Sequence, residues 1–218
     1  MKKITLTLLG LVAFSTTALA QQEVKFGPKA GINLANLSGD IEDNKMLIGF
    51  HVGGFAEIKF NDKFAIQPEI LYSAQGTKMD FSETIMGITY AAEADTKLNY
   101  INVPIMAKYY ITENFAVEAG PYVGFLMSAN SKGSSSAAGI NIEYDEDIKD
   151  ELSTIDFGLG IGASFNMDNG FFIGARANFG LTTVDKDHTE NVGGVNINVE
   201  AADIKNSPVI QVGVGYKF

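Results

Sequence analysis

Apolar residues alternate with polar residues and glycine through eight stretches of this chain, and this alternation constrains the fold more than any other feature. In the last stretch, Gln, Gly, Gly and Lys separate the apolar residues Ile210, Val212, Val214, Tyr216 and Phe218. Successive side chains of a β-strand point to opposite faces of the sheet. The sequence therefore predicts strands with one apolar face and one polar, glycine-rich face.

The spacing of these stretches predicts how the strands are connected. We expect strand cores at residues 24–34, 48–60, 64–74, 101–111, 115–127, 155–165, 171–181 and 210–218. Short turns, in which Asp, Asn and Gly favour tight reversals, alternate with long connections near 35–46, 76–96, 129–152 and 185–206. Outer-membrane barrels show this pattern, with short periplasmic turns and long extracellular loops. The predicted fold is all-β, an eight-stranded antiparallel up-and-down transmembrane β-barrel.

The first 20 residues have the features of a secretory signal peptide. Two lysines precede an apolar run over residues 4–13, and Ala18-Leu19-Ala20 form a small-x-small cleavage site. The run is shorter than the roughly 20 residues that a membrane-spanning helix needs. We therefore expect a signal peptide at residues 1–20 and one outer-membrane β-barrel domain at residues 21–218.

The apolar face of the strands could point to lipid or to the barrel interior. A soluble, secreted, lipocalin-like binding barrel would turn it inward. The interior of an eight-stranded barrel is only just wide enough to be filled by side chains, and the many Phe and Tyr of the apolar set would overfill it. Phe and Tyr also gather near both ends of the strands, as in the aromatic girdles of membrane barrels. We therefore expect the apolar set to face lipid.

Four segments carry a resemblance to a known family. They are Phe-Gly-Pro-Lys-Ala-Gly-Ile-Asn-Leu at 26–34, Phe-Ala-Ile-Gln-Pro-Glu-Ile-Leu-Tyr at 64–72, Tyr-Ile-Asn-Val-Pro at 100–104, and the closing strand that ends in Phe218. These segments resemble small bacterial outer-membrane β-barrel proteins of the "porin family" or PorT-like group. The resemblance implies location in the outer membrane and assembly by the outer-membrane barrel insertion machinery, with Tyr216 and Phe218 as the C-terminal insertion signal.

The polar set contains charges of both signs, which would lie inside such a barrel. We expect a structural polar network in the lumen that is made of Lys29, His51, Glu57, Glu69, Lys108, Glu118 and Arg176. These residues could form a salt-bridged plug or line a narrow porin-like channel for ions or small solutes. The plug is favoured because open aqueous channels belong to barrels of about 16 or more strands, and because buried charges are tolerated when they are paired.

Few residues could support catalysis or hold a cofactor. The chain has no cysteine and only two histidines. His51 falls in the lumen set and His188 in an external connection, and no recognisable motif pairs either with a serine. The acidic run at 145–151 lacks the spacing of an EF-hand calcium loop, so we expect a solvated acidic loop. We expect no enzyme activity, no catalytic residue, no cofactor and no metal.

The net charge of the chain and the position of its acidic residues indicate which classes of partner to expect. The formal net charge of −10 argues against nucleic acid, because phosphate binding needs a basic face. Acidic residues concentrate in the long connections, and the segment Ser134–Gly139 is expected to be flexible. The sequence predicts a non-enzymatic integral outer-membrane protein with a structural, adhesive or protective role. It would contact outer-membrane lipid and an unknown surface ligand.

Overall fold

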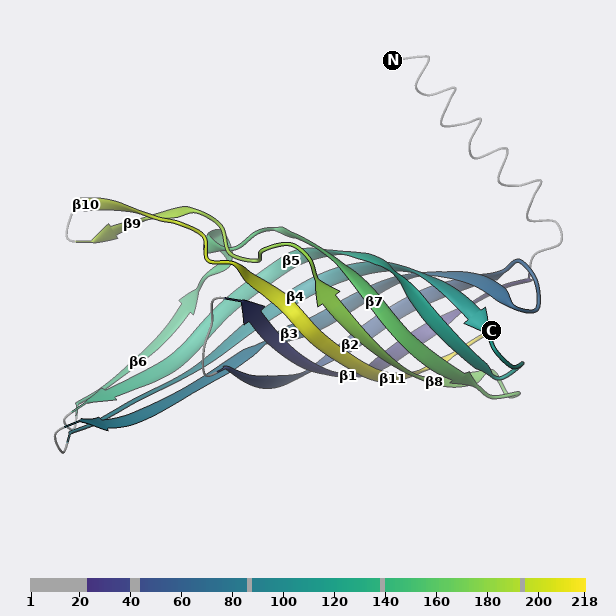
Figure 1. Ribbon diagram of the computed structural model, residues 1–218, viewed down its shortest axis with the longest axis horizontal. Coiled ribbons are helices and arrows are strands. Elements are labelled where there is room, and N and C mark those ends of the chain that lie inside the picture. The colour runs from purple at the N-terminus through teal and green to yellow at the C-terminus, as the bar shows by residue number, and fades with distance from the viewer. Residues whose placement is uncertain (1–22, 40–43, 86–87, 138–139, 193–194) are drawn as a thin grey trace, which may run out of the picture.

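The computed structural model describes residues 23–39, 44–85, 88–137, 140–192 and 195–218, and it shows a closed antiparallel β-barrel (Figure 1). The expected signal peptide at residues 1–20 lies outside the described residues. Eight strands form the ring, namely β1 (Glu23–Gly39), β2 (Asn44–Lys59), β3 (Phe64–Ile85), β4 (Ile88–Tyr110), β5 (Phe115–Ala137), β7 (Ile155–Asn166), β8 (Phe171–Gly180) and β11 (Ile204–Tyr216).

The strands run up and down around the barrel in chain order. The sheet order is β4-β3-β2-β1-β11-β8-β7-β5, and a further pairing of β4 with β5 closes the ring. The first and last strands meet through register pairs such as Lys29 with Gly215 and Leu34 with Ile210. The N–H of Phe218 also donates to the carbonyl of Phe26 at 2.9 Å. The prediction of an eight-stranded antiparallel up-and-down barrel is confirmed.

The two faces of the strands have opposite chemistry, with the apolar set outside. Ile70 is 64 % exposed and Phe26 is 61 % exposed, whereas Arg176 in the polar set is only 3 % exposed. A barrel that folds in water would show the reverse arrangement, because apolar surface gains by leaving water. The soluble lipocalin-like alternative is therefore excluded.

The long connections are mostly strand rather than polar loop, which differs from our expectation. β3, β4 and β5 extend to Ile85, Ile88 and Ala137, and β6 (Ile140–Asp147) adds a further strand beside β5. β9 (His188–Val192) and β10 (Val195–Val199) form a second hairpin. Both extensions project from the same end of the barrel (Figure 1).

The physical reason for this difference is the ladder of backbone hydrogen bonds. An antiparallel ladder can continue past the membrane until a tight turn ends it, even where the side chains are polar. Ser134, Ser135 and Ser136, expected to be flexible, lie in β5 with β4 on one side and β6 on the other. Polar composition alone therefore did not indicate a loop here.

The short turns lie at the opposite end and are stabilised by their own side chains. Oδ1 of Asn61 accepts hydrogen bonds from the N–H groups of Lys63 and Phe64, both at 2.9 Å. Gly170 has a φ of 90°, a left-handed conformation that favours glycine. Within the described part of the chain, no helix has the length and apolar character to span a membrane.

Candidate functional site in the barrel lumen

All seven residues predicted for the lumen lie inside the barrel, and none is more than 8 % exposed. They occupy inward-pointing positions on six of the eight ring strands, which is a direct consequence of the side-chain period of two. β1 supplies Lys29, β2 supplies His51 and Glu57, β3 supplies Glu69, β4 supplies Lys108, β5 supplies Glu118 and β8 supplies Arg176.

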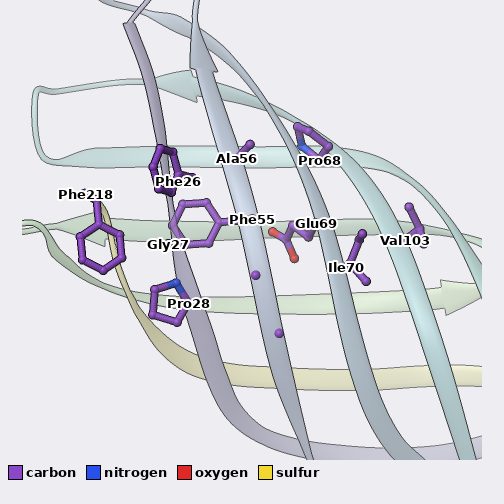
Figure 2. Close-up of a pocket in the computed structure, with 12 residues that line it drawn as sticks. Phe26, Gly27, Pro28, Phe55, Ala56, Pro68, Glu69, Ile70, Val103 and Phe218 are labelled. Carbon is purple, nitrogen blue, oxygen red and sulfur yellow. The ribbon is translucent and has the colours of Figure 1, made fainter.

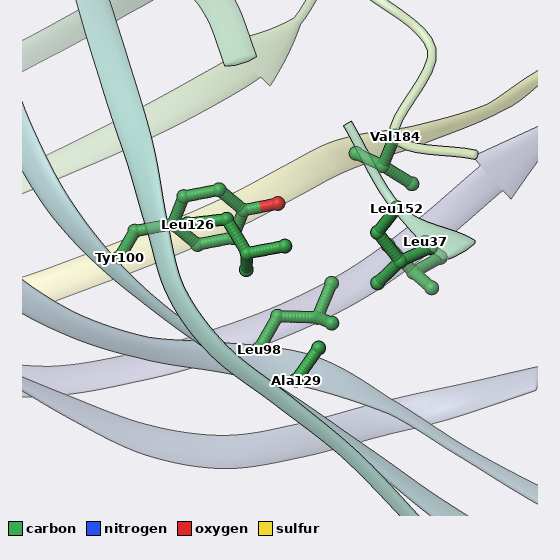
Figure 3. Close-up of a cluster of buried hydrophobic side chains, with 7 residues drawn as sticks. All are labelled: Leu37, Leu98, Tyr100, Leu126, Ala129, Leu152 and Val184. Carbon is green, nitrogen blue, oxygen red and sulfur yellow. The ribbon is translucent and has the colours of Figure 1, made fainter. Parts of the chain in front are cut away.

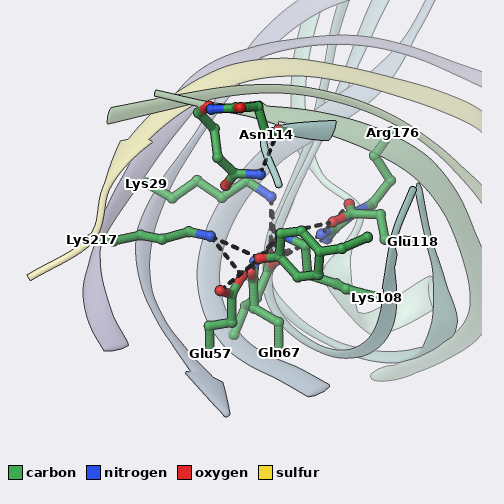
Figure 4. A network of polar contacts seen from close by, with 11 residues as sticks. Lys29, Glu57, Gln67, Lys108, Asn114, Glu118, Arg176 and Lys217 are labelled. Carbon is green, nitrogen blue, oxygen red and sulfur yellow. Dashed lines mark hydrogen bonds and ion pairs between the residues drawn. The ribbon is translucent and has the colours of Figure 1, made fainter. Parts of the chain in front are cut away.

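Arg176 is the centre of the charged network (Figure 4). Its Nη1 and Nη2 donate to the two carboxylate oxygens of Glu69 at 3.0 and 2.6 Å, and its Nε donates to Glu118 at 2.8 Å. Nζ of Lys29 lies 3.2 Å from the Glu69 carboxylate. The planar guanidinium fork suits two carboxylates at once, and Lys29 supplies the second positive charge that two carboxylates require.

Glu57 is the centre of a second group of contacts nearer the short turns. Its Oε2 lies 3.2 Å from Nζ of Lys108 and 2.7 Å from Nζ of Lys217. The hydroxyl of Tyr110 donates to its other oxygen at 2.7 Å. Gln67 joins the two groups, since its amide donates to Glu69 at 2.7 Å and its carbonyl oxygen accepts from Lys108 at 3.0 Å.

Gln67, Tyr110 and Lys217 were not predicted as members of the network. All three occupy inward positions in the same alternation that identified the other residues. Gln67 and Tyr110 carry no charge, and Lys217 lies near the end of its strand. A prediction based on charged residues near the middle of the strands therefore did not include them. Hydrogen-bonding capacity at inward positions was the signal that could have found them.

His51 lies beside the ion pairs and contacts a different group. The Asn33 amide nitrogen donates to Ser73 Oγ at 3.0 Å and to two main-chain carbonyls, which orients the amide. Oδ1 of Asn33 then faces the His51 Nδ1 at 2.8 Å and accepts from Gln211 at 3.2 Å. Since an amide oxygen can only accept, Nδ1 of His51 carries a proton.

Two glycines make room for the His51 ring. A Cβ added at Gly31 would lie 2.6 Å from the ring carbon Cε1, and one at Gly213 would lie 2.9 Å from Nε2. Nε2 of His51 and Oγ of Ser164 have no hydrogen-bond partner among the described residues, and both residues line an interior cavity of about 10 Å³. The two atoms do not contact each other, so they lack the geometry of a nucleophile and its base.

An apolar cluster fills the external end of the lumen, and the sequence did not predict it (Figure 3). The cluster consists of Leu37, Leu98, Tyr100, Leu126, Ala129, Leu152 and Val184, all of them buried. Leu152 and Val184 come from the connections outside the ring strands. The Tyr100 hydroxyl accepts a hydrogen bond from Asn206 at 3.1 Å, which links the cluster to polar groups below it.

The outer surface carries a groove of about 750 Å³ near the short turns (Figure 2). Phe26, Pro28, Pro68, Ile70 and Phe218 are among the residues that line it. Small residues between larger ones produce the depression. Because the groove lies on the apolar outer face, it faces the acyl chains of lipid. Glu69, whose carboxylate belongs to the charged network, also lines part of the groove.

Tyr216 and Phe218, the predicted insertion signal, lie at the short-turn end. The rings of Tyr216 and Phe218 have centroids 5.0 Å apart, and Phe218 is 6.1 Å from Phe26. Phe171 stands on the other side of Tyr216, at 4.9 Å. These four aromatic residues form one part of the girdle at this end.

Comparison with known proteins identifies the family. Residues 19–186 match the family model described as the outer membrane protein beta-barrel domain. The chain belongs to this family. As a member of this family it is a protein of the bacterial outer membrane, and its outer face contacts lipid. No curated protein matches the chain.

Solved structures with a similar fold have little sequence identity to this chain. Ail, the attachment invasion locus protein of Yersinia pestis, is 16 % identical with a TM-score of 0.48, and the match covers 90 % of this chain and 99 % of Ail. Neisserial surface protein A is 15 % identical with a TM-score of 0.45, over 90 % of this chain and 99 % of that one. Outer membrane protein W of E. coli is 15 % identical with a TM-score of 0.36, over 91 % and 100 %.

Proposed function

We propose that this protein is a non-enzymatic outer-membrane barrel with a closed, non-conducting lumen, and that it acts through the surface it presents outside the cell. Its role would be structural, adhesive or protective. The observation that carries the proposal is the ion pair between Arg176 and Glu69. β8 and β3 are four strands apart in either direction around the ring, so this 2.6 Å contact crosses the full width of the lumen.

Two other contacts cross the lumen in the same way. β11 and β4 are also four strands apart in both directions. Nζ of Lys217 donates to the Tyr110 hydroxyl at 3.2 Å near the short turns, and Asn206 donates to the Tyr100 hydroxyl at 3.1 Å near the external end. Side chains from opposite walls therefore meet at three levels. An ion that passed through would have to separate each pair.

The paired charges support a plug rather than a channel. Removing one partner from a buried ion pair leaves an uncompensated charge at a cost of about 3–5 kcal/mol. A thermal fluctuation that separated Arg176 from both Glu69 and Glu118 would likewise leave buried charges with fewer partners, which is unfavourable. The narrow channel for ions or small solutes is the alternative, and it requires these contacts to be absent for much of the time.

Conductance of the full-length protein, refolded and inserted into planar lipid bilayers, tests the proposal. We expect no steady single-channel current from the wild-type protein. The double variant Glu69→Ala/Arg176→Ala removes both partners of the ion pair that crosses the lumen. It is the matched control, because its lumen is wider than that of the wild-type protein. Steady, ion-selective currents through the wild-type protein that change with Arg176→Ala would overturn the closed lumen and establish the channel.

We further propose that Tyr216 and Phe218 are read by the outer-membrane barrel insertion machinery. Their outward position at the short-turn end supports this. Phe218→Ser should slow assembly into vesicles that contain the machinery and leave spontaneous assembly into plain vesicles unchanged. Phe26→Ser is the matched control, because Phe26 packs beside Phe218 in the same girdle. Equal slowing by both variants would contradict a specific signal.

A further inference from the structure

The sheet that rises above the barrel ends in an unpaired edge. β6 pairs with β5 and with no other strand among the described residues. All eight of its residues are exposed, whereas strands of the ring alternate between exposed and buried positions. Figure 1 shows β6 at the margin of the extension, away from the barrel wall. An edge strand of this kind is open to pairing with another chain.

The two faces of β6 have different chemistry. Ile140, Ile142 and Tyr144 point to one face and are 67 %, 63 % and 37 % exposed. Glu143 and Asp145 point to the other face, since side chains alternate along a strand. A strand that pairs with β6 would therefore meet apolar side chains on one face and carboxylates on the other.

The apolar face of β6 continues across the extension. Ile142 lies opposite Ser135 of β5, Ser135 opposite Ala92 of β4, and Ala92 opposite Phe81 of β3. Residues opposite one another in antiparallel strands share a face of the sheet. Phe81 is exposed. Small residues in the middle and large apolar residues at both margins make this face accessible to apolar side chains of a partner.

The other face carries an excess of negative charge. Asp145 is paired with Lys132 at 2.7 Å, and the hydrogen bond from Lys132 holds the pKa of Asp145 below its ordinary value. Glu143 lies opposite Ser134, and Ser134 lies opposite Glu93. Neither glutamate has an ion pair with a cation in the described part of the chain. The charges of these two glutamates are therefore not balanced by a basic residue in the described part of the sheet.

We propose that the free edge of β6 binds an extended segment of a partner protein by strand addition, and that the segment alternates apolar and basic residues. Main-chain hydrogen bonds would supply affinity, and the alternating side chains would supply specificity. Basic residues opposite Glu143 and its neighbours would form favourable cross-strand pairs. This inference goes beyond the closed-lumen proposal, because it concerns the external sheet and holds whether or not the lumen conducts.

A second copy of this chain is a less suitable occupant of the edge. Pairing β6 with β6 brings two strands together that both carry Glu143, Asp145, Glu146 and Asp147 within five residues. Like charges on opposing strands destabilise a ladder. A basic segment removes this repulsion, and charge complementarity therefore selects a partner of different sequence.

Binding of a synthetic peptide to the full-length protein in phosphatidylcholine nanodiscs tests the inference. The probe is a fluorescent ten-residue peptide of alternating Lys and Val, and its binding is measured by anisotropy at low salt. The comparison peptide has the same composition with all lysines in one block and all valines in the other. We expect the alternating peptide to bind and the block peptide to bind at least about fivefold more weakly, because only the first can match both faces.

Two matched variants locate the binding site. Glu143→Lys should weaken binding of the alternating peptide about fivefold, because it converts a cross-strand attraction into a repulsion. Glu113→Lys makes the same charge change at an exposed short turn and should leave binding unchanged. Equal effects of the two variants, or equal affinity for the two peptides, would overturn strand addition at β6. A protein dimer in ultracentrifugation that Glu143→Lys strengthens, by removing like-charge repulsion between two β6 strands, would assign the edge to a second copy and likewise overturn the proposal.

Discussion

At the scale of single residues, the lumen depends on side chains that satisfy several partners at once. Arg176 makes four close contacts with Glu69 and Glu118, and a lysine at the same place could not reproduce their fork geometry. The Gln67 amide donates to one ionic group through its nitrogen and accepts from the other through its oxygen. The network is therefore specified by shape as well as by charge.

Arg176→Ala tests how tightly this network is coupled. The change leaves Glu118 without its closest cation, and we expect the free energy of unfolding in lipid vesicles to fall by about 3–5 kcal/mol. Lys132→Ala is the control, because Lys132 forms an exposed ion pair with Asp145 whose loss should cost about 1 kcal/mol or less. Similar small losses for both variants would mean that water screens the lumen charges, which contradicts a plug.

At the scale of secondary structure, the alternation of side chains along each strand decides which residues face lipid and which face the lumen. A shift of one residue would move every side chain to the wrong face, so the ladder is continuous through most of the barrel. The register shifts that do occur lie toward the external end, for example between Met46 and His51 and between Asn99 and Tyr100. There the strands leave the membrane and begin the extensions.

Ile161→Arg tests whether the exposed outer face of the strands contacts lipid. Ile161 lies in the middle of β7 and is exposed, and a cation at the bilayer midplane costs about 2–4 kcal/mol. Denaturant unfolding in vesicles should show this loss for Ile161→Arg and for Val212→Arg. Ile142→Arg is the control, since Ile142 is exposed on β6 outside the membrane, and its effect should be below about 1 kcal/mol. Three equal effects would argue against a lipid-facing surface.

An inward glycine such as Gly213 is a poor control for that experiment, because the barrel has no room for a side chain there. A Cβ at Gly213 would lie 2.6 Å from the carbonyl oxygen of Ala30, a main-chain atom that cannot move aside easily. The same Cβ would also press on the His51 ring. We therefore expect Gly213→Ala to destabilise the barrel, with a Tm below that of the wild-type protein in the same vesicles. An unchanged Tm would show that the strands can shift apart at this level.

At the scale of the whole molecule, the even number of ring strands determines which segments share a side of the membrane. The short turns and Phe218 lie at one end, and the extensions built from β3 to β6 and from β9 and β10 lie at the other (Figure 1). Every assignment of lumen, lipid and surface depends on this arrangement.

Single cysteines test this topology directly, because the native chain has none. Ser135 in the extension and Asn169 in a short turn are both exposed. A membrane-impermeant thiol reagent should label Ser135→Cys in whole cells and should label Asn169→Cys only after the outer membrane is opened. Labelling of both in intact cells would contradict the predicted topology. Labelling of Asn169→Cys but not of Ser135→Cys would reverse the predicted orientation, and the surface role of β6 would be excluded with it.

The sequence by itself determined the number of ring strands, the face of each strand that meets lipid, and the inward position of all seven predicted lumen residues. All of these follow from a local rule, the alternation of side chains along a strand. The same rule could not say that Arg176 meets Glu69, because these residues are 107 positions apart. That contact depends on ring closure, which places β8 opposite β3.

Only the tertiary structure decided how the ends of the lumen are filled and where the external strands pair. Leu152 and Val184 reach the apolar cluster from connections whose sequence shows no strand alternation. The serines of β5 are held in place by the strands on both sides. In each case, the conformation of a segment is set by neighbours distant in sequence, since backbone hydrogen bonds and packing across the barrel outweigh local composition.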